Sequence, residues 1–150
     1  IQEREGKLLR EIIAEKGEDG LLEIENEVNA SVNAKNSVIS PGGSVIYCKE
    51  AMKHYKKIGT IVYLKASYQT IKRRIKNPKK RGVVLKEGQS LRDLYYERVP
   101  YFEKYADITV CEDGCRIEDT IKNVLNAVKK YRKTTEFRKK LDNVPKSKLK

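Results

Sequence analysis

The sequence predicts an α/β protein in which short strands of a parallel sheet alternate with amphipathic helices. Two apolar, β-branched runs indicate strands at residues 60–64 and 107–110, and a third short run lies at 37–40, before Pro41. Between and after these runs, apolar residues recur at helical spacing. This alternation is typical of a parallel sheet with helices on both faces, which binds its ligands at the carboxyl ends of the strands.

Each element has its own local signal. Helices are expected over residues 8–13, 21–32, 50–57, 67–75, 90–105 and 117–128. Gly17 should end the first of these and Gly59 should close the third. Ser67 is expected to cap the fourth helix, and Pro100 is expected to break or kink the fifth. The run at 60–64 is continuously apolar, which predicts a strand buried on both faces.

The composition indicates a folded domain, which we expect to be cytoplasmic and, when the protein is complete, monomeric. Hydrophobic residues make up 39% of the 150 residues and charged residues 36%, which favours a globular protein over a disordered one. The sequence contains neither an apolar run long enough to span a membrane nor a signal peptide. Three cysteines with no repeated spacing predict reduced structural thiols, and a single histidine excludes zinc motifs that need two. No metal ligand is assigned within the chain.

Most of the positive charge lies at the end of the chain. Residues 129–150 hold ten basic and two acidic side chains, which is eight of the net charge of +12. We interpret this segment as a solvated, partly disordered extension of a core at 1–128. A basic nucleic-acid-binding module remains an alternative, although no recognised nucleic-acid motif supports it. The chain opens at Ile1 and its only methionine is Met52, so it is expected to be a fragment or a processed product.

Two glycine-containing segments are candidate ligand-binding elements. The turn Pro41-Gly42-Gly43-Ser44 follows the first expected strand, and its glycines would allow positive φ and close approach of the backbone to a ligand. The basic loop at about 78–89 contains Arg81 and could close over a polyanion. An ordinary tight turn and a solvated surface loop are the alternatives.

Arg98 is a candidate for binding a carboxylate. The guanidinium forms a planar, bidentate fork, and Pro100 nearby could aim the side chain away from the helix surface. The alternative is a surface arginine paired with Glu97 or Asp93.

These segments resemble the shikimate kinase family in order and spacing, from residue 2 to about residue 128. The turn at 41–44 resembles the triple-glycine turn of the family, and residues 81–85 (Arg-Gly-Val-Val-Leu) resemble its lid. Residues 97–107 resemble the segment Glu-Arg-x-Pro-Leu-Tyr-x-x-x-Ala-Asp, which is the most specific of the three matches.

The resemblance implies a three-layer P-loop kinase with ATP and Mg²⁺ as cofactors. The implied reaction is phosphorylation of the 3-hydroxyl of shikimate, in aromatic amino acid biosynthesis. Gly42 and Gly43 would contact this small-molecule substrate, and Arg98 would bind its carboxylate. Arg81 would reach the transferring phosphate from the lid. Arg74 would stack on adenine, an assignment that depends on spacing alone.

Two departures from the family pattern qualify this expectation. Leu22 stands where the family has a second carboxylate-binding arginine. Either shikimate binding is weaker, another residue compensates, or the chain is a related small-molecule kinase with another acceptor. The phosphate-loop pattern Gly-x-x-x-x-Gly-Lys-Ser/Thr does not occur in the 150 residues. The fold is therefore expected to be incomplete at the N-terminus, where the central first strand and the main ligands of ATP and Mg²⁺ would lie. This fragment alone would be inactive, and a non-catalytic protein is a further alternative.

Overall fold

The computed structural model describes residues 1–76, 83 and 85–142, and the side chains of these residues up to 136. The chain divides into two compact units. The first, here called the helical unit, comprises residues 1–61 and 93–105, and the second, the sheet unit, comprises residues 62–92 and 106–150.

The helical unit is built from short and long helices that follow the predicted pattern. Its elements are α1 (Gln2–Glu5), α2 (Leu9–Ala30), the 3-10 helix η1 (Val45–Tyr47), α3 (Lys49–Ile58) and most of α5 (Leu91–Tyr105). Gly17 interrupts α2 with φ 71° and ψ −174°, so the two predicted helices are the two halves of α2. Gly59 lies at the C-terminal end of α3, as predicted.

The core of the helical unit lies between η1, α3 and α2. Its buried members are Val45, Ile46, Cys48, Ala51, Met52 and Tyr55. Two side chains of α2 reach across to α3: Asn26 accepts a hydrogen bond from the backbone N–H of Ala51 at 3.1 Å, and Asn29 accepts one from the Tyr55 hydroxyl at 2.6 Å. The segment that follows the Gly42–Gly43 turn is therefore anchored on α2 by both apolar and polar contacts.

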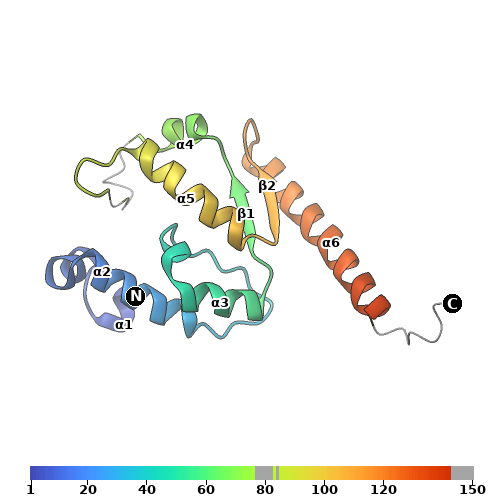
Figure 1. Cartoon of the computed structure of the whole chain (residues 1–150), viewed down its shortest axis with the longest axis horizontal. Helices are drawn as coiled ribbons and strands as arrows, with labels where there is room; N and C mark the ends of the chain where they lie inside the picture. Colours follow the sequence, from blue (N-terminus) through green and yellow to red (C-terminus); the bar gives the residue numbers. More distant parts are fainter. Residues whose placement is uncertain (77–82, 84, 143–150) are drawn as a thin grey trace. The chain divides into compact units, whose positions relative to one another are not determined.

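The sheet unit contains the parallel sheet. Strands β1 (Val62–Lys65) and β2 (Ile108–Cys111) pair in parallel, in a register that sets Val62 opposite Ile108. Helix α4 (Tyr68–Arg74) follows β1, and α6 (Ile117–Asp142) follows β2, as Figure 1 shows. The parallel pairing and the alternation of strand and helix confirm the predicted α/β class and are compatible with a P-loop kinase fold.

Two predictions about these elements were wrong, and a third was wrong in part. Residues 37–40 form no strand, and Val38 is 97% exposed, because no other described segment forms a backbone ladder with this run. Leu64 in β1 is 45% exposed instead of buried, since an apolar strand is covered only where other elements lie against it. Of the break or kink expected at Pro100, the break is absent: α5 continues to Tyr105, because one lost backbone hydrogen bond is tolerated in a helix of 15 residues.

The C-terminal helix runs further than its apolar stripe predicted. Helix α6 continues to Asp142, so residues 129–142 of the basic segment are helical, and 143–150 lie outside the described residues. Most of the predicted lid, including residues 77–82 and 84, also lies outside them. None of the helices in the described part of the chain has the length and apolar character needed to cross a membrane.

Candidate active site

The glycine turn of the helical unit is held against α2. The backbone N–H of Val45 donates to the carbonyl of Gly42 at 3.2 Å, and the Ser44 hydroxyl donates to Oε2 of Glu25 in α2 at 2.6 Å. The predicted positive φ is absent at Gly42 and Gly43. What Gly43 provides is space, because a Cβ atom at this position would lie 3.1 Å from Nη1 of Arg98.

Arg98 lies at this turn. One guanidinium nitrogen approaches Gly43, and the guanidinium carbon lies over the ring of Tyr47, 5.6 Å from its centroid. The Nε atom of Arg98 is buried and has no hydrogen-bond partner among the described residues. Buried donors are rarely left unsatisfied, and a charged donor pairs best with an anion. Gly43 and Arg98 thus form a corner that is suited to an acidic group.

Tyr47 links this corner to the carboxylate next to Arg98. Its hydroxyl donates to Oε1 of Glu97 at 2.5 Å, and its ring meets that of Tyr101 edge-on, with centroids 5.6 Å apart. Burial, and next the hydrogen bond to Glu97, raise the pKa of Tyr47, so the phenol stays protonated and donates at neutral pH. Sequence reasoning missed Tyr47 and assigned Glu97 only as an alternative ion-pair partner, because no local pattern marks their contact.

Leu22 belongs to the core instead of the corner. It is partly buried against the cluster of η1 and α3, and its carbonyl accepts a weak hydrogen bond from the Cys48 thiol at 3.7 Å. Burial, with a smaller contribution from the charge of Glu25, raises the pKa of Cys48 to about 11. This thiol is protonated at neutral pH and is a poor nucleophile.

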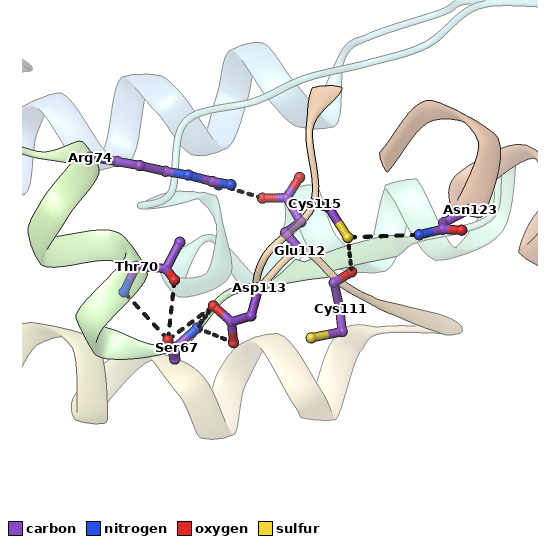
Figure 2. A network of polar contacts seen from close by, with 8 residues as sticks. All are labelled: Ser67, Thr70, Arg74, Cys111, Glu112, Asp113, Cys115 and Asn123. Carbon is purple, nitrogen blue, oxygen red and sulfur yellow. Dashed lines mark hydrogen bonds and ion pairs between the residues drawn. The ribbon is translucent and has the colours of Figure 1, made fainter. Parts of the chain in front are cut away.

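The sheet unit carries a polar network at the carboxyl ends of its two strands, drawn in Figure 2. Asp113, just after β2, accepts hydrogen bonds from the backbone N–H of Ser67 at 3.0 Å and from its hydroxyl at 2.9 Å. The Ser67 hydroxyl in turn caps α4 by accepting from the backbone N–H of Thr70 at 3.3 Å. Hydrogen bonds from Thr70 and then from Ser67 lower the pKa of Asp113. The network joins the start of α4 to the loop after β2.

Arg74 lies at the other end of α4 and belongs to the same network. Its guanidinium pairs with Oε2 of Glu112 at 2.8 Å, as Figure 2 shows. It lines an open hollow of about 490 Å³ together with Ile71, Ile75 and Val83. A flat guanidinium beside aliphatic side chains is a surface on which an aromatic ring can stack. Arg81, the lid candidate, lies outside the described residues.

Metal ligands do not gather among the described side chains. No group of three or more His, Cys, Asp or Glu residues among them is arranged to hold a metal. The cysteines are free: Cys48 is buried, Cys111 is exposed and Cys115 is partly exposed.

The fold and the site define a class: an α/β protein in which a glycine turn meets the buried guanidinium Nε of an arginine. Comparison with known proteins identifies the family within this class. A family model described as shikimate kinase matches residues 1–129. The chain belongs to the shikimate kinase family, which confirms the resemblance seen in the sequence and assigns a kinase-type transferase.

Individual relatives agree with the family match. A shikimate kinase of Chlorobium chlorochromatii (strain CaD3) is 31% identical over 144 residues, which is 88% of this chain and 75% of that protein. A shikimate kinase of Persephonella marina is 26% identical over 130 residues, covering 86% and 79% of the two chains. Human threonine synthase-like 1 is 36% identical over 123 residues, but this match covers 81% of the present chain and 17% of that protein.

Proposed function

We propose that this protein phosphorylates the 3-hydroxyl of shikimate with ATP as the phosphoryl donor, on a three-layer P-loop kinase fold. The observation that carries the proposal is the corner at Gly43 and Arg98, where a buried guanidinium Nε has no partner among the described residues. Family membership supports a kinase acting on shikimate, and the corner supports the binding of its carboxylate.

The residues of the corner act by orienting the acceptor. Arg98 binds the carboxylate through charge-assisted hydrogen bonds, and the backbone at Gly42 and Gly43 lies beside the bound acceptor. Such contacts fix the direction in which the hydroxyl group faces its phosphoryl donor, and correct orientation is a large part of catalysis in phosphoryl transfer.

The nucleotide is proposed to contact two other arginines. Arg74 would stack on the adenine, which is supported by the hollow that it lines with Ile71, Ile75 and Val83. Arg81 would reach the transferring phosphate from the lid. The phosphate-loop pattern is not among the 150 residues, so we expect these residues by themselves to bind the acceptor without transferring phosphate.

Calorimetric titration with shikimate tests this proposal. Replacing Arg98 by Gln should weaken binding by about 10- to 150-fold, because hydrogen bonds to charged groups contribute about 1.5–3 kcal/mol. Arg4→Gln is the matched control, since Arg4 belongs to the same unit and pairs with Glu27 at 2.7 Å. Equal affinities of the Arg98 variant and the unmodified chain would contradict the assignment of the acceptor site.

Leu22 favours a second candidate, a related small-molecule kinase with another acceptor. This position packs against the core and supplies no second guanidinium for the acceptor's carboxylate. The same titration with a panel of hydroxylated carboxylic acids separates the two candidates. An acid that binds more than about tenfold tighter than shikimate, and that loses this affinity in Arg98→Gln, would favour the second.

A further inference from the structure

We propose that Tyr47 is a positioning residue that holds the Arg98 guanidinium ready for the acceptor's carboxylate and keeps the Glu97 carboxylate away from it. The inference rests on the proposed function, because it concerns the same acceptor corner, and it adds a residue that the motif comparison did not single out.

The geometry places one tyrosine against two consecutive residues of α5. The Tyr47 ring lies under the guanidinium of Arg98, with 5.6 Å from the guanidinium carbon to the ring centroid, and its hydroxyl reaches Oε1 of Glu97 at 2.5 Å. Consecutive residues of a helix point about 100° apart, so a single side chain that contacts both restrains both directions. Tyr101, one turn further along α5, supports the ring from its edge.

The Tyr47 ring is itself firmly placed. It follows directly on the buried residues Val45 and Ile46 of η1 and packs against the core cluster. On the other side of the turn, Gly43 leaves only enough space for Nη1 of Arg98, since a Cβ atom there would approach it to 3.1 Å. The guanidinium is thus bounded by the turn and by the ring, and little side-chain freedom remains to be lost when an anion binds.

The hydrogen bond to Glu97 has an electrostatic consequence. A carboxylate next to Arg98 in sequence could turn toward the guanidinium and compete with the acceptor's own carboxylate. Tyr47 gives that carboxylate a hydrogen-bond donor other than the guanidinium, and the raised pKa of the phenol keeps the donor proton in place. Removal of the hydroxyl leaves Glu97 without this restraint.

The experiment compares two conservative variants that each remove one partly buried tyrosine hydroxyl from the same unit. Tyr47→Phe keeps the ring but loses the bond to Glu97. Tyr55→Phe is the matched control, because the Tyr55 hydroxyl donates to Asn29 at 2.6 Å on the α2 side of α3. Titration with shikimate should show about 3- to 10-fold weaker binding for Tyr47→Phe and less than twofold change for Tyr55→Phe, the range expected from one hydrogen bond. Urea melts should show similar losses of stability in both.

A rescue variant separates positioning from a general structural role. If Tyr47 acts by restraining the Glu97 carboxylate, Glu97→Gln in the Tyr47→Phe background should restore most of the affinity, because a neutral amide does not compete as an anion. Equal weakening by both Tyr→Phe variants, or no rescue by Glu97→Gln, would overturn the inference.

A second measurement does not depend on the acceptor. The Arg98 Nε–H proton is buried, so its exchange with water, followed by ¹H–¹⁵N NMR, should be slow in the unmodified chain. It should be at least about tenfold faster in Tyr47→Leu, which removes the ring beside the guanidinium, and unchanged in Tyr55→Leu. Faster exchange in Tyr47→Leu, together with no shikimate binding by the unmodified chain, would support the positioning role while refuting the proposed function. Unchanged exchange in Tyr47→Leu would overturn the positioning role alone.

Discussion

Replacement of Gly43 by alanine should weaken acceptor binding without unfolding the protein. The new Cβ atom would lie 3.1 Å from Nη1 of Arg98, whereas non-bonded heavy atoms prefer about 3.5–4.0 Å. The guanidinium must therefore move by about 0.5 Å, which is easy for the end of a flexible side chain but displaces the group proposed to bind the carboxylate. If this shift removes about half of a charged hydrogen bond, the loss is about 1 kcal/mol, or roughly fivefold in Kd.

Stability should respond differently from binding. Gly43 has no positive φ, so alanine introduces no backbone strain there, and the smaller entropy of the unfolded chain should leave stability unchanged or slightly increased, by up to about 1 kcal/mol. The assays are calorimetric titration with shikimate and a urea melt of each variant.

Gly59→Ala is the matched control for this experiment. Its φ of −158° is ordinary extended backbone, and its Cβ atom would meet the Tyr55 carbonyl at 3.9 Å, a normal contact. Unchanged affinity in Gly43→Ala, or an equal loss in Gly59→Ala, would refute the argument that the space at Gly43 positions Arg98.

Three further predictions concern other parts of the chain. Asp113→Asn should lower the free energy of unfolding at pH 7, as measured by urea melts. Because the folded pKa of Asp113 lies below its usual value of 3.8, the difference in stability between the variant and the unmodified chain should shrink as the pH falls below 3.8. Cys48, whose pKa is raised to about 11, should resist a thiol reagent at pH 7 until the chain is denatured, whereas exposed Cys111 should react in the native state. Mass spectrometry locates the label, and rapid labelling of Cys48 in the native state would contradict its burial. Gly17→Ala should destabilise the chain by about 1–3 kcal/mol in a urea melt, since φ 71° with ψ −174° is a conformation that only glycine adopts easily. Unchanged stability would show that α2 can straighten at this residue.

Local features of the chain were predictable from the sequence. The apolar periodicity and the break at Gly17 identified both halves of α2, and the β-branched runs identified β1 and β2, because these signals depend on residues that are neighbours in the chain. Ser67 was correctly expected to cap α4, since a cap bonds to a backbone N–H only three residues away. The meeting of Gly43 with Arg98 followed from the family pattern and not from periodicity.

Contacts between distant residues were decided only by the tertiary structure. The run at 37–40 has the composition of a strand, but a strand forms only where a partner offers its backbone, and no other described segment pairs with this run. The hydrogen bond between Tyr47 and Glu97 joins residues 50 positions apart, and the salt bridge between Arg74 and Glu112 joins residues 38 apart. The sequence alone determined the helices, the two paired strands and the candidate arginines, because these signals are local. The orientation of each arginine depends on side chains that only folding brings beside it.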